Sequence, residues 1–85
     1  MNYKVHYKII DSSNSLFIVQ EHYIEDPDSW GDKLNKIIIY NLMTKQKIEF
    51  DSKSDIELKL NYFKEKKNGK TMYYNMDFEK IYTES

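Results

Sequence analysis

Apolar and polar residues alternate from Tyr3 to Ile9, a pattern typical of β-strands with one buried face. In the first segment, 3–11, every second residue is apolar or aromatic: Tyr3, Val5, Tyr7 and Ile9. A polar stretch at 11–15 supplies turn-forming residues, and a second strand is predicted over 16–24. These two segments predict an antiparallel hairpin.

The register of this hairpin follows from its two faces. Pairing in which the residue numbers add up to 28 places Val5 opposite Tyr23 and Ile9 opposite Val19, on the expected core face. It also places His6 opposite His22, on the expected solvent face. A slip of one residue would mix apolar and polar residues on both faces, so this register is the predicted one.

Three further strands are predicted over 36–43, 47–51 and 71–82. The first of them carries Ile37, Ile38 and Ile39, which puts isoleucine on both faces and favours a central place in the sheet.

The segment 53–67 fits two structures. As a helix, Ser54 would be the N-cap with Glu57 three residues later, and Asn68-Gly69 would end the helix. As a strand, Ile56 and Leu58 continue a period-two pattern and Asn68-Gly69 becomes a hairpin turn. Good helix formers across 57–67 favour the helix.

The predicted fold class is therefore α+β and rich in β-structure. We expect a single domain over 1–85, without a linker, with an antiparallel sheet of about five strands (3–11, 16–24, 36–43, 47–51 and 71–82) and one helix (53–67). The alternative is an all-β six-stranded antiparallel meander.

The composition excludes several chemistries. The chain has no Cys, which excludes disulfides, thiolate catalysis and cysteine-bound metals. It has no Arg, so the guanidinium fork that recognises phosphate and guanine is missing. Arg and Ala, both absent, have GC-rich codons, so the gene is expected to come from an AT-rich genome or from a phage or mobile element of such a host.

No segment predicts a membrane span or a targeting signal. The longest apolar run, 37–40, is far shorter than the roughly 18 residues that cross a bilayer. We therefore expect a cytoplasmic protein, and no residue pattern predicts a cofactor.

Two arrangements suggest metal binding but do not complete a site. Asp26, Asp28 and Gly31 resemble positions one, three and six of a calcium-binding EF-hand loop, but Trp30 stands at a ligand position and Ile37 at the twelfth position, which needs Glu. The pair of His6 and His22 supplies only two ligands for zinc. No metal site is predicted.

No nucleophile, base and oxyanion donor come together in the sequence, so no enzymatic activity is expected. Lysines and a tyrosine near the end of the chain suggest a single-stranded nucleic-acid binder as an alternative function, with charge and base stacking as its means. The candidate residues are Lys64, Lys66, Lys67, Lys70 and Tyr73. The net charge of −1 counts against this alternative.

The acidic loop that carries the only Trp is the leading candidate site, because Trp is enriched at interface hot spots. Its partner-binding residues are Glu25, Asp26, Asp28, Trp30 and Asp32. They predict a protein partner with a basic surface. We expect a protein-binding module, such as a phage- or mobile-element-encoded inhibitor of a host nucleic-acid-handling defence enzyme, of the anti-CRISPR kind. The alternative is a general cytoplasmic interaction domain. The sequence does not determine the oligomeric state of the protein, and a dimer is one of the states considered.

Overall fold

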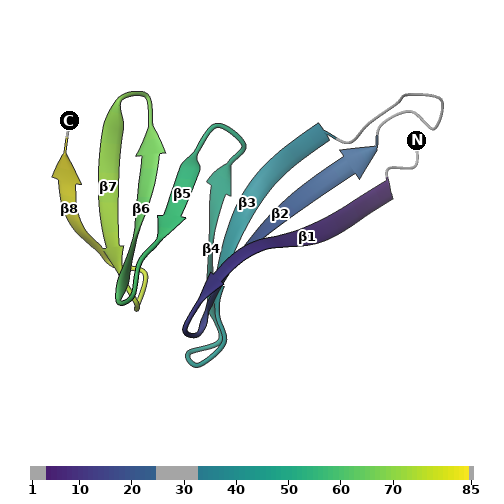
Figure 1. Ribbon diagram of the computed structural model, residues 1–85. Helices are drawn as coiled ribbons and strands as arrows, with labels where there is room; N and C mark the ends of the chain where they lie inside the picture. The colour runs from purple at the N-terminus through teal and green to yellow at the C-terminus, as the bar shows by residue number, and fades with distance from the viewer. Residues whose placement is uncertain (1–3, 25–32, 85) are drawn as a thin grey trace.

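The computed structural model describes residues 4–24 and 33–84, which form eight strands in two four-stranded antiparallel sheets (Figure 1). Strands follow one another in chain order in both sheets. The first sheet contains β1 (Lys4–Ser13), β2 (Leu16–Ile24), β3 (Lys33–Asn41) and β4 (Gln46–Asp51). The second contains β5 (Asp55–Leu58), β6 (Tyr62–Lys67), β7 (Lys70–Asn75) and β8 (Lys80–Glu84).

The predicted helix over 53–67 is wrong, and with it the α+β class. The segment forms β5 and β6, which pair with Glu57 opposite Lys64 and Leu58 opposite Phe63. Asn68 and Gly69 have φ angles of 54° and 77°, the left-handed conformation of a two-residue hairpin turn. Burial explains the outcome, since alternation in β6 sends Phe63 and Glu65 into the interior. The all-β alternative had the right class, but eight strands replace its six.

The predicted strand over 71–82 is two strands. The chain turns between β7 and β8, where the side chain of Asn75 accepts hydrogen bonds of 2.9 Å from the backbone N–H groups of Asp77 and Glu79. Phe78 takes a positive φ of 65° in this turn. Side-chain capping by Asn is a common local cause of turns. The alternation of apolar residues continues through the turn and therefore did not reveal it.

The predicted hairpin register is confirmed. Val5 pairs with Tyr23, His6 with His22, and Ile9 with Val19. Beyond Ile9 the register shifts at a β-bulge, and the strand continues to Ser13, so the turn is shorter than the predicted polar stretch.

The predicted core face of this hairpin is wrong. Val5, Tyr7 and Ile9 are 50%, 58% and 68% exposed. The core lies on the opposite face, where Leu16 and Ile18 of β2 are buried. Alternation separates the two faces of a strand, but it does not say which face is covered when both are apolar.

The core lies between the two sheets. Residues from both sheets form it: Leu16, Ile18, Ile37, Ile39 and Phe50 from the first, and Phe63 and Tyr74 from the second. The rings of Phe63 and Tyr74 stack at 4.9 Å, and Phe50 meets Phe63 edge-on at 6.2 Å. These contacts join the end of the first sheet to the second.

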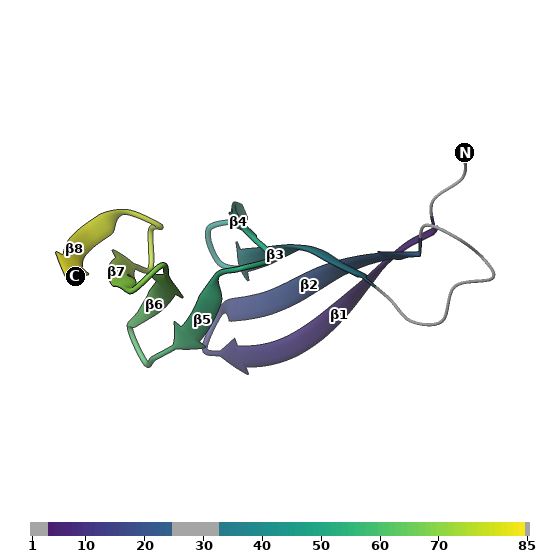
Figure 2. The same ribbon diagram turned by 90° about the horizontal axis from the view of Figure 1, so that it is seen from above.

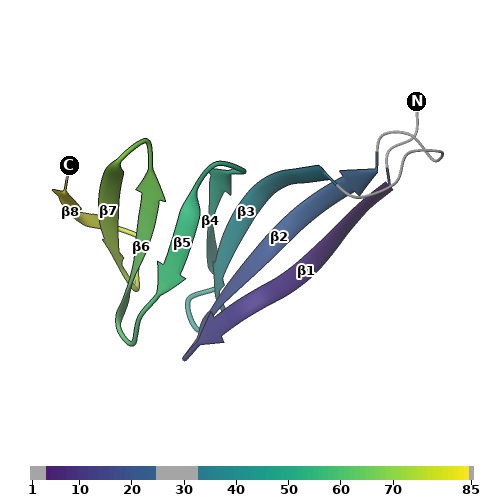
Figure 3. The same ribbon diagram turned by 45° about the horizontal axis from the view of Figure 1, so that its top comes forward.

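The two sheets are also joined at their margins. The chain passes from β4 to β5 through a short turn, and β1 and β8 lie at opposite ends of the molecule in all views (Figures 1, 2 and 3). Asn14 donates a 2.6 Å hydrogen bond to the carbonyl of Leu60, and Asn41 donates one of 2.9 Å to that of Met76. The first sheet therefore has one face against the second sheet and one face turned away from it.

Candidate protein-binding surface

The acidic loop predicted as the partner site lies outside the described residues. This applies to Glu25, Asp26, Asp28, Trp30 and Asp32. The described chain stops at Ile24, the end of β2, and resumes at Lys33, the start of β3. The assignment of this loop as a binding site stays a prediction.

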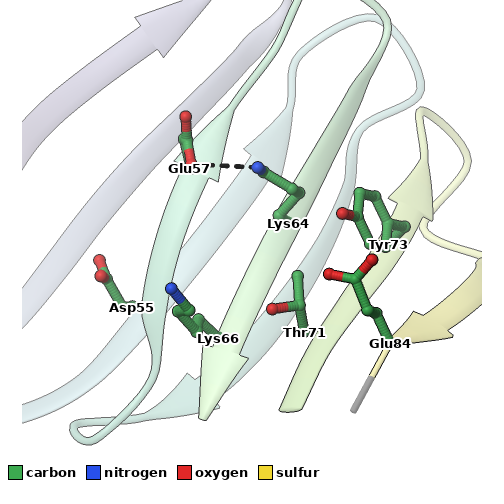
Figure 4. Close-up of a pocket in the computed structure, with 7 residues that line it drawn as sticks. All are labelled: Asp55, Glu57, Lys64, Lys66, Thr71, Tyr73 and Glu84. Carbon is green, nitrogen blue, oxygen red and sulfur yellow. Dashed lines mark ion pairs between the residues drawn. The ribbon is translucent and has the colours of Figure 1, made fainter. Parts of the chain in front are cut away.

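The residues of the predicted lysine cluster are divided between two faces of the second sheet. Lys64, Lys66 and Tyr73 line one hollow of about 240 Å³ (Figure 4). Lys67 and Lys70, by strand alternation, belong to the opposite face, and Lys67 pairs with Asp51 at the end of β4. The structure thus brings together three of the five candidates.

Carboxylates share the hollow with the lysines. It is lined by Asp55, Glu57, Lys64, Lys66, Thr71, Tyr73 and Glu84. Lys64 Nζ lies 3.4 Å from Glu57 Oε2 and 5.8 Å from the ring centre of Tyr73 (Figure 4). Hydrogen bonds from Lys59 and Lys64 hold the pKa of Glu57 below its ordinary value. With three carboxylates to two lysines, the hollow carries no net positive charge to attract phosphate.

A row of tyrosines crosses the same face. Tyr62 and Tyr73 have ring centres 6.0 Å apart, and Tyr73 and Tyr82 are 5.5 Å apart. Such cross-strand aromatic pairs stabilise a sheet and also offer rings for stacking. Of these three tyrosines, Tyr73 alone was among the predicted nucleic-acid-binding residues, and Tyr62 lies in the segment that was predicted as a helix.

The larger apolar surface lies on the first sheet. We call the side of β1–β4 turned away from the second sheet the outer face. Its residues follow from the strand registers: Val5, Tyr7, Ile9, Ser12, Phe17, Val19, Glu21, Tyr23, Lys33, Lys36, Ile38, Tyr40, Lys47, Glu49 and Asp51.

The centre of the outer face is apolar. Ile9, Phe17, Val19 and Tyr40, with Leu42 just after β3, line a shallow groove of about 190 Å³. Ile9 and Leu42 are 68% and 61% exposed. Ile38, paired with Val19 on one side and Glu49 on the other, is only 2% exposed. The first sheet is thus apolar on both faces.

Charged residues border this centre on the β3–β4 side. Lys36 Nζ lies 2.6 Å from Glu49 Oε2 and 3.9 Å from Glu21 Oε2. The hydrogen bond to Glu49 raises the pKa of Lys36 and lowers that of Glu49. A hydrogen bond with Glu21 raises the pKa of the Tyr7 phenol. The outer face therefore has an apolar centre and a polar border, the usual anatomy of a protein interface.

The sequence contained the signal for this surface. Val5, Tyr7 and Ile9 form an apolar stripe on one face of the first predicted strand, and isoleucine lies on both faces of 37–39. The two observations together indicate a sheet with two apolar faces.

The two histidines are stacked, with ring centres 5.5 Å apart and planes 4° from parallel. His22 Nε2 is 2.9 Å from Gln20 Oε1. The pair is half-buried on the core side of the first sheet, not on a fully solvated face as expected. Among residues 4–24 and 33–84, no three or more potential ligands gather as a metal site would require.

Comparisons of the chain with protein families, with curated proteins and with solved structures find no match. The part of the chain that the structure describes contains no helix with the length and apolarity to cross a membrane.

Proposed function

We propose that this protein is a non-enzymatic module that works by binding protein through the outer face of its first sheet. One observation carries the proposal: among residues 4–24 and 33–84, no element covers the apolar centre of that face, where Ile9 and Leu42 are exposed. Antiparallel sheets with one solvated face usually alternate apolar and polar residues. Contiguous exposed apolar surface with a polar rim marks interaction sites.

The exposed side chains are not needed for the core between the sheets. Val5, Tyr7 and Ile9 face away from it and are at least half exposed. Exposed apolar side chains contribute little to the stability of the fold, because hydrophobic stabilisation is proportional to the apolar area removed from water. They would stabilise a complex in which a partner covers them.

The narrower proposal is an inhibitor, encoded by a phage or mobile element, that blocks a host nucleic-acid-handling defence enzyme. It is supported by the acidic composition of 25–32 and by its single Trp. This segment joins β2 to β3, whose ends carry Tyr23 and Lys33 beside Val5. The carboxylates of 25–32 would attract a partner with a basic surface.

A second candidate function is binding of single-stranded nucleic acid on the second sheet. The row of Tyr62, Tyr73 and Tyr82, with Lys64 beside Tyr73, favours it. The carboxylates in the same hollow oppose phosphate. Protein binding through the outer face is therefore the leading proposal.

The experiment is capture of partners from the native host by tagged protein, with matched variants. Ile9→Lys places a charge in the apolar centre, whereas Ile81→Lys makes the same change at an equally open site on β8, 58% exposed. Partner recovery should be lost with Ile9→Lys and kept with Ile81→Lys. A partner retained by Ile9→Lys but lost by Trp30→Ala would assign binding to the loop instead.

A further inference from the structure

We infer that the outer face of the first sheet is covered by a second copy of this chain, in a symmetric dimer that packs the two outer faces against each other. The inference rests on the proposed function, because it uses the same surface and names its occupant. Three properties of that face argue for a second copy.

The first property is self-complementary charge. A two-fold interface brings the same patch of both copies together, so the patch must match itself. The apolar centre of one copy would meet the apolar centre of the other. The border contains three residues of each sign, so rotation by 180° allows a lysine to meet a carboxylate: Glu21, Glu49 and Asp51 with Lys33, Lys36 and Lys47. A strongly one-signed border would have indicated a partner of opposite charge.

The second property is the overall charge. The chain has a net charge of −1, so two copies repel each other little at long range.

The third property is area. β1, β2 and β3 are nine or ten residues long and β4 has six. At about 3.3 Å per residue and about 4.8 Å between strands, the face covers about 500 Å². Two such faces packed together bury about 1,000 Å², without the additional area that protruding side chains contribute. This is about the lower limit of buried area for a specific protein interface. Face-to-face packing of two sheets about 10 Å apart is the ordinary geometry of a β-sandwich.

Edge-to-edge pairing through β1 is the competing way to join two copies. β1 is the edge of the first sheet, but it carries Lys8 and a bulge between Ile9 and Asp11. Edge lysines and bulges are the devices that prevent such pairing. Edge pairing would also leave the apolar centre of both copies uncovered. The face is therefore the favoured contact.

The test is sedimentation equilibrium of the purified chain from about 5 µM to about 500 µM, because interfaces of about 1,000 Å² belong to the weaker class of complexes. The wild-type mass should approach twice 10.3 kDa as concentration rises. Ile9→Lys and Leu42→Lys should raise the dissociation constant by about 30-fold or more, the hot-spot scale. Ile81→Lys should leave it within about 3-fold, because it changes an equally exposed residue outside the face.

Circular dichroism of each variant establishes that it is folded, and these apolar residues are exposed enough to tolerate lysine. A wild-type chain that stays monomeric at about 500 µM overturns the inference. A dimer that Ile9→Lys and Leu42→Lys leave intact overturns it equally, since the contact then lies elsewhere. The proposed function is judged separately by partner capture. If the chain is a monomer but captures a partner that Ile9→Lys loses, the dimer is excluded and the proposed function stands. If the chain is a monomer and captures no such partner, both proposals are excluded.

Discussion

Ser54 donates a 2.5 Å hydrogen bond to the carboxylate of Glu65, and both side chains are buried. Glu65 also accepts a hydrogen bond of 3.5 Å from the Tyr74 hydroxyl. Ser54 lies in the turn between the sheets and Glu65 in the middle of β6, so this bond ties the turn to the interior of the second sheet. The residue expected to cap a helix instead serves as the partner of a buried acid.

Ser54→Ala should lower the free energy of unfolding by about 1–3 kcal/mol, because it leaves the buried carboxylate of Glu65 short of one donor. Urea unfolding followed by circular dichroism measures the change. Ser52→Ala, exposed in the same turn, is the control and should change stability by less than about 0.5 kcal/mol. Equal losses for the two variants would contradict the role of this bond.

Asp51 and Lys67 predict a dependence of stability on pH. The hydrogen bond from Lys67, and then that from the backbone N–H of Lys53, hold the pKa of Asp51 below its ordinary value. A carboxyl with a lowered folded pKa adds stability above its unfolded pKa of about 3.9 and loses it as pH falls through the folded value.

Asp51→Asn should therefore be less stable than the wild type at pH 7, and the difference should shrink to nothing below the folded pKa of Asp51. Urea midpoints across this pH range measure it. Asp77→Asn removes the same charge from the exposed β7–β8 turn and should have a smaller effect at pH 7. A constant difference between Asp51→Asn and wild type at all pH values would rule out the ionised carboxylate as its cause.

The stacked histidines give a direct test of the β1–β2 register. With ring centres 5.5 Å apart, the ring protons of His6 and His22 should show cross-relaxation in NMR spectra. His6→Ala should shift the His22 ring resonances, because the ring current of its neighbour is removed. Separate, unconnected ring signals in the wild type, with no response of His22 to the substitution, would disprove the pairing.

The hollow on the second sheet predicts weak nucleic-acid binding. Three carboxylates beside Lys64 and Lys66 should keep a fluorescent single-stranded oligonucleotide from binding at physiological salt. Fluorescence anisotropy measures this, and Asp55→Asn with Glu57→Gln should increase binding by removing the opposing charge. Tight binding by the wild type that Tyr73→Ala abolishes would instead favour the second candidate function.

Local patterns predicted most of the first sheet. The register of β1 and β2 followed from the alternation of both strands, since a slip of one residue changes every face. β4 was predicted to within one residue, because Ile48 and Phe50 alternate between polar turns. These features depend on neighbours in sequence.

The failures depend on tertiary contacts. Ser54, Glu57 and good helix formers satisfied the local rules for a helix. Phe63, however, is buried against aromatic rings from distant parts of the chain, Phe50 and Tyr74 among them. The burial of Ile18 instead of Ile9 depends on where the second sheet docks. The periodicity of the sequence shows neither the packing around Phe63 nor the face on which the second sheet docks.

The central claim is that protein covers the outer face of the first sheet. Photo-crosslinking in the native host tests it most directly, with a benzophenone side chain placed at Ile9 and, as the control, at the similarly exposed Ile81. The account predicts a discrete adduct from position 9, either with a second copy or with another protein, and none from position 81. No adduct from position 9, or the same adducts from both positions, would contradict it.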